Sequence, residues 1–126
     1  MTKEEYLLTV ASEECIEVSK EIHKALRFGL DDYNPREKRP NKLLIALEYM
    51  DLISSFSKLY EEGILDMDKI LEDNGFDYED LILKKLEKIE TFWEYSIKSK
   101  DNIEEVKWNY QSILKNYNNM KRSMGI

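Results

Sequence analysis

The sequence predicts an all-α protein, and three observations carry this prediction. Apolar residues recur at helical spacing over several long segments, whereas no segment shows the period-two alternation of a half-buried strand. The chain has few helix breakers, with 4 Gly and 2 Pro in 126 residues. Its hydrophobic share of 42% and charged share of 36% are ordinary for a globular helical protein. We therefore expect one domain, 1–126, folded as an antiparallel bundle of four to five helices.

The charge and the single cysteine narrow the class of protein. A net charge of -7 argues against binding to a nucleic-acid polymer, which calls for a basic face. It leaves a nucleotide substrate open, because bound cations reverse the field of an acidic site. Cys15 allows no intrachain disulfide and suits a reducing cytoplasm, where we expect it to be a small buried hydrophobe. Because no secretory or membrane-spanning segment is apparent, we expect a cytoplasmic protein.

The first helix is expected over residues 2–28. Thr2 followed by Glu5 is a capping-box pattern, and Gly29 is a natural stop. At 100° per residue, several apolar side chains fall in one arc and form the expected buried face. They are Leu7, Ala11, Val18, Ile22 and Ala25.

The second helix is expected over residues 42–62, with Asn41 as its N-cap and Gly63 at its end. Between residues 43 and 60 it is apolar nearly all round, and a helix of this kind is normally buried against several neighbours. The charged residues of that stretch are Glu48, Asp51 and Lys58.

Three further elements follow: a short helix over 66–72 with a turn at 74–75, a long helix over 78–98, and a last helix from Asp101 or Asn102 to about residue 121. The expected core positions of the long helix are Leu81, Leu86, Ile89, Phe92, Trp93 and Ile97. Those of the last helix are Ile103, Val106, Tyr110, Ile113, Leu114 and Tyr117.

Two acidic pairs stand where apolar side chains would be expected. Glu14 and Glu17 are three residues apart on the first helix, and Glu48 and Asp51 are three apart on the second, so each pair shares a helix face. If the two helices pack antiparallel, the four carboxylates converge. Such a group repels itself or takes up protons unless a cation neutralises it. All-oxygen ligands favour Mg²⁺, or Mn²⁺, over zinc or copper.

Other interpretations of these acids stay open. Acidic pairs at this spacing are common on solvated helix faces, although Glu48 and Asp51 lie in the middle of the most apolar helix. A di-iron bundle would need Glu-x-x-His on each of two helices. The single histidine, His23, has Lys20 three residues before it and is expected to be an exposed helix residue.

The same residues resemble a known family. EECIE (13–17) and EYMD (48–51) look like the EExxE…ExxD signature of the all-α, MazG-like nucleoside triphosphate pyrophosphohydrolases. KALRFGLDD (24–32) and KKLEKIETFWEYS (84–96) are also similar to phage and bacterial members. The resemblance covers roughly residues 7–98, and the last helix is an extension for assembly or for covering the site.

The resemblance implies a MazG-like fold that assembles as a homodimer or homotetramer. It implies Mg²⁺-dependent hydrolysis of an NTP or dNTP to the monophosphate and pyrophosphate, a house-cleaning reaction of nucleotide metabolism. The metal ligands would be Glu14, Glu17, Glu48 and Asp51. Glu13 would be a catalytic group that orients the attacking water, or else a surface residue.

Basic side chains would bind the pyrophosphate part of the substrate. The candidates are Lys24, Arg27, Lys85 and Lys88, although residues of this type near helix ends are often merely solvated. The basic loop 36–42 either closes over the triphosphate or is a solvated connector.

Three alternatives remain beside the pyrophosphohydrolase. The chain could bind and sequester a nucleotide as a regulatory protein without fast turnover. It could be a non-catalytic helical interaction module with structural acids. It could also be a phosphoribosyl-ATP pyrophosphohydrolase, a variant of the same broad fold.

Overall fold

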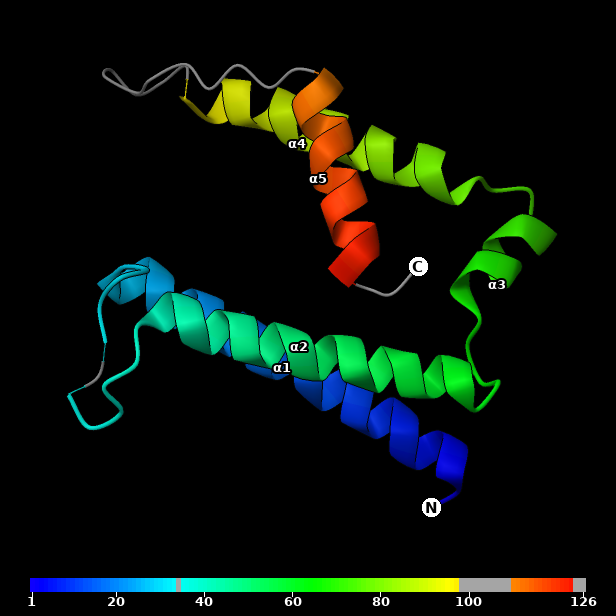
Figure 1. Cartoon of the computed structure of the whole chain (residues 1–126), viewed down its shortest axis with the longest axis horizontal. Coiled ribbons are helices and arrows are strands. Elements are labelled where there is room, and N and C mark those ends of the chain that lie inside the picture. The colour runs from blue at the N-terminus through cyan, green and yellow to red at the C-terminus, as the bar shows by residue number, and fades with distance from the viewer. Residues whose placement is uncertain (34, 98–109, 124–126) are drawn as a thin grey trace. The chain divides into compact units, whose positions relative to one another are not determined.

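The computed structural model describes residues 1–33, 35–97 and 110–123, and these residues form five helices and no strand (Figure 1). The all-α prediction is confirmed. The helices are α1 (Lys3–Phe28), α2 (Asn41–Glu61), α3 (Met67–Asp73), α4 (Tyr78–Ile97) and α5 (Tyr110–Ser123). The chain divides into two compact units, Met1–Met67 and Asp68–Ile126. Among the described residues, no helix has the length and apolar character needed to cross a membrane.

The ends of α1 follow the local signals of the sequence. The backbone N–H of Glu5 donates to Thr2 Oγ1 over 3.1 Å, and the N–H of Thr2 donates to a carboxylate oxygen of Glu5 over 3.3 Å. This reciprocal capping box satisfies two N–H groups that lack partners within the helix. Gly29, at φ 99°, donates to the carbonyl of Ala25 over 2.7 Å and ends the helix. Both predicted boundaries are therefore confirmed within a residue.

The role predicted for Asn41 is wrong. Pro40 is the N-cap of α2, and Asn41 is its first residue, with only 4% of its surface exposed. The Asn41 side-chain amide donates to the carbonyl oxygen of Gly29 over 2.9 Å, and its backbone N–H donates to the carbonyl of Asp32 over 2.8 Å. The carbonyls at the end of a helix lack partners within it, so Asn41 supplies a donor there and ties α1 to α2.

Helices α1 and α2 lie side by side and antiparallel (Figure 1). Steps of four and three residues mark the contact positions on both helices, the spacing of a coiled-coil interface. We call these positions the seam, and each of its residues is buried or half-buried. The seam consists of Leu7, Ala11, Glu14, Val18, Glu21 and Ala25 on α1, and of Asn41, Ile45, Glu48, Leu52, Ser55, Leu59 and Glu62 along α2 and its C-cap.

A buried apolar cluster of the seam lies toward the start of α1 and the end of α2. Leu7, Ala11 and Leu59 form its buried core, and Ile64 and Leu65 pack against them. Leu59 is the most deeply buried of them, with 1% of its surface exposed. Burying a leucine side chain stabilises a fold by about 1.5–3 kcal/mol, so this cluster anchors the helix pair.

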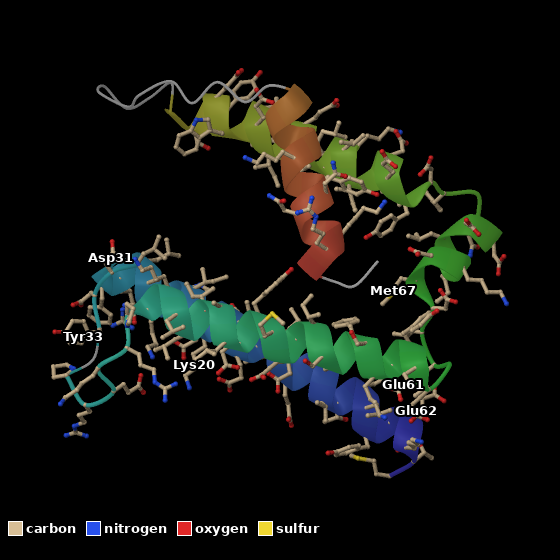
Figure 2. All side chains as sticks on the ribbon, in the orientation of Figure 1. Lys20, Asp31, Tyr33, Glu61, Glu62 and Met67 are labelled. Atoms are coloured by element: carbon tan, nitrogen blue, oxygen red, sulfur yellow. The ribbon has the colours of Figure 1, made fainter. Side chains whose placement is uncertain are left out.

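An ion pair joins the two helices at the same end of the hairpin. Lys3 Nζ lies 2.6 Å from a carboxylate oxygen of Glu62, which Figure 2 labels at the end of α2. Lys58 Nζ lies 3.3 Å from the other oxygen of Glu62. Hydrogen bonds from Lys3 and then Lys58 hold the pKa of Glu62 below its ordinary value. Glu62 therefore keeps its charge, and both ends of the hairpin are fixed by polar contacts.

Three burial predictions for this unit are wrong. Ile22 is 41% exposed, because the seam takes Glu21 instead. Cys15 is exposed, since it follows the seam residue Glu14 and lies about 100° away from it around the helix. Helix α2 is not buried all round, because α1 covers one of its faces. The large apolar residues that stay exposed on α2 are Leu43, Leu47, Met50, Phe56 and Tyr60.

In the second unit, α5 packs on α4. The rings of Tyr78 and Tyr117 lie 6.3 Å apart, and Tyr117 is 2% exposed, as predicted for a core residue. The turn predicted at residues 74–75 is confirmed before α4, with Gly75 at φ 79°.

Several core predictions for α4 are wrong. Ile89 is 45% exposed and Phe92 66% exposed, while Leu81 and Trp93 also remain accessible. An apolar stripe loses exposure only where another element covers it, and α5 covers part of α4. Leu86 is half-buried, as is Leu114 on α5. The predicted start of the last helix, Ile103 and Val106 lie outside the described residues, as do the side chains of Ile97, Tyr110 and Ile113.

The seam makes Leu59 the residue whose truncation costs most in the first unit. Leu59→Ala is expected to lower the free energy of unfolding by about 2–5 kcal/mol, because it leaves a cavity between α1 and α2. Urea unfolding followed by circular dichroism measures the loss. Leu26→Ala is the matched control, since Leu26 is 76% exposed and its truncation should change stability by less than about 0.5 kcal/mol. Equal losses would contradict the assignment of Leu59 to the core.

Candidate metal centre

Three of the four predicted ligands come together on the first unit. Glu14 of α1 and Glu48 and Asp51 of α2 each offer a carboxylate oxygen, and these atoms all lie within 4.8 Å of one another. We call these three residues the acidic cluster. Two of them, Glu14 and Glu48, occupy seam positions, and Asp51 lies one turn beyond Glu48 on a neighbouring face. The antiparallel arrangement that the sequence required for convergence is present.

The register of the hairpin explains why these acids meet. Lys3 pairs with Glu62 at the open end of the hairpin, where α1 begins and α2 ends. Eleven residues further along α1 from Lys3 is Glu14, and eleven residues back along α2 from Glu62 is Asp51. Eleven residues are about three helical turns, so both steps return to the same face. The contact that fixes the end of the hairpin therefore also places Glu14 opposite Asp51.

The three residues of the acidic cluster differ in how far they are buried. Glu14 and Glu48 are half-buried and Asp51 is exposed. Oxygen Oε2 of Glu14 is inaccessible to solvent and has no hydrogen-bond partner among the described residues. A buried acceptor without a partner costs about 1–3 kcal/mol, and more when it is charged. The fold on its own therefore leaves one carboxylate oxygen unsatisfied at the centre of the seam.

The surroundings of the acidic cluster change the pKa of Glu48. The pKa of its carboxyl group is raised above its ordinary value of 4.5. Burial is the largest cause, and repulsion from Asp51 is the next. Glu14, Glu17 and Glu21 add smaller repulsions across the seam. Four negative charges thus act on one half-buried carboxylate, and the charged form of Glu48 is disfavoured.

The donor set fits a hard divalent cation. Every ligand atom is a carboxylate oxygen, the type that Mg²⁺ and Mn²⁺ prefer. Oxygens bound to Mg²⁺ at about 2.1 Å lie at most about 4.2 Å from one another. The observed limit of 4.8 Å is close to this value, so small side-chain rotations would complete the geometry. A cation bound by Glu14 would also neutralise the carboxylate that carries the unpaired Oε2.

Glu17, the fourth predicted ligand, lies outside this group. Its carboxylate is 3.9 Å from Lys20 Nζ, and its side chain is 43% exposed. Lys20 itself is 63% exposed and is labelled beside the hairpin in Figure 2. Glu17 is still near enough to raise the pKa of Glu48. A rotation away from the weak pair with Lys20 would be needed before it could bind a cation.

Apart from Lys24, the other predicted site residues are all exposed. Glu13 is exposed, about 100° around α1 from Glu14. Arg27 is exposed, and its guanidinium lies 5.4 Å from the centre of the Phe28 ring. Lys85 and Lys88 are exposed on α4, in the second compact unit. Their roles stay predictions.

Lys24 is the predicted substrate-binding residue with the most defined environment. Its Nζ atom lies 3.1 Å from oxygen Oε2 of Glu21. Glu21 is a seam residue with 7% of its surface exposed. It was absent from the predicted site, although its spacing of seven residues from Glu14 places both on one face. A spacing of seven residues is one heptad, and this spacing is the feature of the sequence that could have identified Glu21.

The loop between α1 and α2 is held at its end. Lys42 forms an ion pair with Asp31, and an isolated antiparallel β-bridge joins Tyr33 to Pro40. The basic residues Arg36, Lys38 and Arg39 are exposed in this loop. Whether the loop closes over a ligand stays a prediction.

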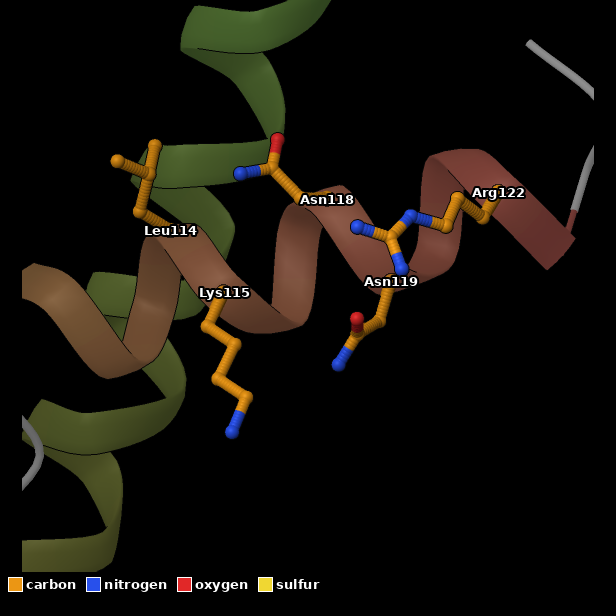
Figure 3. Close-up of a pocket in the computed structure, with 5 residues that line it drawn as sticks. All are labelled: Leu114, Lys115, Asn118, Asn119 and Arg122. Carbon is orange, nitrogen blue, oxygen red and sulfur yellow. The ribbon is translucent and has the colours of Figure 1, made fainter.

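A pocket on the second unit makes a weaker candidate. Its volume is about 330 Å³, and the residues that line it are Leu114, Lys115, Asn118, Asn119 and Arg122 (Figure 3). These residues all belong to α5, and their side chains spread along that one helix. Because no second element is among the described residues that line it, the pocket shows no polar groups converging from different elements, as a binding site would.

Comparison with models of known families, with curated proteins and with solved structures found no match to this chain.

The raised pKa of Glu48 predicts how stability depends on pH and on Mg²⁺. When a carboxyl group has a higher pKa in the folded state, its contribution to stability is full below its unfolded pKa and is lost as pH rises through the folded pKa. In EDTA, the wild type should therefore lose stability as pH rises from about 4.5. Thermal unfolding followed by circular dichroism should show that Mg²⁺ restores this loss.

Two variants make this measurement specific. Glu48→Gln removes the titrating charge, so its midpoint in EDTA should fall less with pH and should rise less with Mg²⁺. Glu61→Gln is the matched control, because Glu61 is an exposed acid of α2 that pairs with Lys58. Its response to Mg²⁺ should equal that of the wild type. Equal Mg²⁺ responses in the wild type and Glu48→Gln would exclude Glu48 as a ligand.

Proposed function

We propose that this chain is a Mg²⁺-dependent nucleotide pyrophosphohydrolase, which converts an NTP or dNTP to the monophosphate and pyrophosphate. One observation carries the proposal: carboxylates from two helices converge at seam positions where apolar side chains would stabilise the fold better. Their resemblance to the EExxE…ExxD signature supports the assignment to this reaction. The acidic cluster offers the ligands Glu14, Glu48 and Asp51, and Glu17 joins them after rotation.

The reaction breaks the bond between the α-phosphorus and the oxygen that bridges to the β-phosphate. A water oxygen forms the new bond to phosphorus, the water proton leaves, and pyrophosphate departs with the bridging oxygen. When bound, Mg²⁺ supplies charge neutralisation at the phosphate oxygens and acidifies a water. The half-buried cluster excludes part of the solvent, which strengthens these electrostatic effects.

The chain's own residues divide the remaining tasks. Glu14 and Glu48 hold the ligand geometry from their seam positions, while the more exposed Asp51 and Glu17 are the ligands that an arriving substrate can reach. Glu13, one residue before Glu14, is the acid assigned to orient the attacking water. Lys24, which pairs with the seam residue Glu21, supplies the positive charge that the leaving pyrophosphate needs.

Assembly with further copies of the chain is part of the proposal. The exposed apolar residues of α2 leave a face that α1 does not cover. A homodimer or homotetramer that covered this face would bury it and complete a pocket for the base, in keeping with the family resemblance.

A panel of NTPs and dNTPs tests the function. Purified protein with Mg²⁺ should release pyrophosphate from at least one of them, measured with a coupled phosphate assay. Glu48→Gln should lower kcat/KM by at least about 100-fold, because even groups that only orient metal ligands cost 10–100-fold when they are removed. Glu61→Gln, with the same chemical change at a site away from the cluster, should keep the wild-type rate.

The outcomes separate the alternatives. Nucleotide binding that needs Mg²⁺ and Glu48 but gives no turnover would replace the enzyme with a nucleotide-sequestering protein of the same fold. Neither binding nor release with any nucleotide would leave a helical interaction module whose acids are structural, and the proposed function would be rejected.

A further inference from the structure

Glu21 is an unusual residue for its position. It lies on the seam of α1, 7% exposed, and is the one charged side chain among the buried residues of the described chain. Carboxylates are almost never fully buried unless they are paired. Its oxygen Oε2 accepts no hydrogen bond from the described residues. Burial of a charge at this position costs stability, so an interaction with a partner must account for it.

The partner is Lys24. Its Nζ atom lies 3.1 Å from that same oxygen of Glu21, close enough for an ion pair although the angles do not make a hydrogen bond. The Lys24 side chain is 32% exposed. It therefore lies partly buried near the seam and stays partly accessible to solvent. An ammonium has three donors, and those not turned to Glu21 are available to a ligand.

Lys20 and Arg27, which lie on the same half of α1, behave differently. Lys20 lies 3.9 Å from its acid, Glu17, and its side chain is 63% exposed. Arg27 is exposed over the ring of Phe28. Among the described ion pairs of α1, the acid is most deeply buried in the Glu21–Lys24 pair, and a buried acid restricts the positions that its partner can take. Surface ion pairs without such an anchor contribute little.

The pair lies next to the acidic cluster. Glu21 lies seven residues from Glu14 on the same seam of α1, about two helical turns along the helix, and its charge contributes to the raised pKa of Glu48. Glu21 is nevertheless not among the three residues whose ligand oxygens lie within 4.8 Å. Glu21 therefore borders the candidate metal centre without belonging to it.

We propose that Glu21 is a positioning residue, which holds the ammonium group of Lys24 beside the acidic cluster so that it binds the pyrophosphate part of the substrate. The inference rests on the proposed function and adds a residue that the sequence motifs do not contain. A lysine held in place loses less side-chain entropy when it binds a phosphate than a free lysine does. Glu21 acts through Lys24 and touches no substrate.

The direction in which pyrophosphate affinity changes when Glu21 is replaced distinguishes a positioning role from simple charge repulsion. Pyrophosphate is strongly anionic, so removing a nearby negative charge should by itself tighten its binding. If Glu21 acts by positioning Lys24, its removal should weaken binding instead. Glu21→Gln is nearly isosteric and tests this directly.

The experiment measures the affinity of Mg²⁺-bound inorganic pyrophosphate by calorimetry, beside KM and kcat for the best nucleotide. Glu21→Gln should weaken pyrophosphate about tenfold, the factor that corresponds to about 1.4 kcal/mol, and raise KM more than it lowers kcat. Lys24→Gln should do the same. The double variant should match Lys24→Gln within about twofold, since both changes remove one interaction.

Two controls keep the test decisive. Mg²⁺ alone should raise the unfolding midpoint of Glu21→Gln as much as that of the wild type, because Glu21 is not a ligand. Glu21→Asp retains the charge but withdraws it by one methylene, and should weaken pyrophosphate in the same direction if Glu21→Gln does not fold.

Three results would overturn the inference: tighter or unchanged pyrophosphate binding in Glu21→Gln, additive effects in the double variant, or no pyrophosphate binding by the wild type. A smaller Mg²⁺ response in Glu21→Gln would make Glu21 a ligand and also overturn it. The failure of the proposed function is a separate observation, namely absence of turnover in the wild type, because pyrophosphate binding needs no turnover.

Discussion

Contact between α1 and α2 along the seam is the interaction on which the first unit depends. Leu59, buried between the helices, supplies the apolar anchor, and polar contacts fix the register at both ends. Lys3 reaches Glu62 at one end, and Asn41 reaches the carbonyl of Gly29 at the other. A shift of the register would separate the carboxylates of the two helices. The same contacts that hold the hairpin together therefore assemble the acidic cluster.

Acidic side chains in the seam also reduce the stability of the helix pair, and the fold by itself does not offset this cost. Glu14, Glu21 and Glu48 take positions that an ordinary helix pair fills with apolar side chains, and they give up hydrophobic burial. Burial and mutual repulsion raise the pKa of Glu48, and one oxygen of Glu14 has no hydrogen-bond partner among the described residues. Sites that retain such local costs are typical of function. A divalent cation at the cluster, and Lys24 beside Glu21, would both relieve the cost.

Local signals made much of the fold predictable. The capping box at Thr2 and the stop at Gly29 are short-range effects, and they appear as expected. Convergence of the two acidic pairs was predictable from their spacing, but the rotation of Glu17 toward Lys20 was not, because a rotamer depends on its neighbours. Exposure was harder still. The burial expected for Ile22 and α2 needed the helix register and the number of covering partners, and neither is encoded in the spacing of one helix.

The central claim is that a cation binds between α1 and α2 at the acidic cluster. A crystal structure of the protein grown with Mn²⁺, with anomalous scattering measured at the manganese edge, tests it most directly. The account predicts an anomalous peak at about 2.2 Å from carboxylate oxygens of Glu14, Glu48 and Asp51, slightly beyond the distance typical of Mg²⁺. The contradicting result is a well-ordered hairpin with its cluster carboxylates turned to solvent and no peak between them.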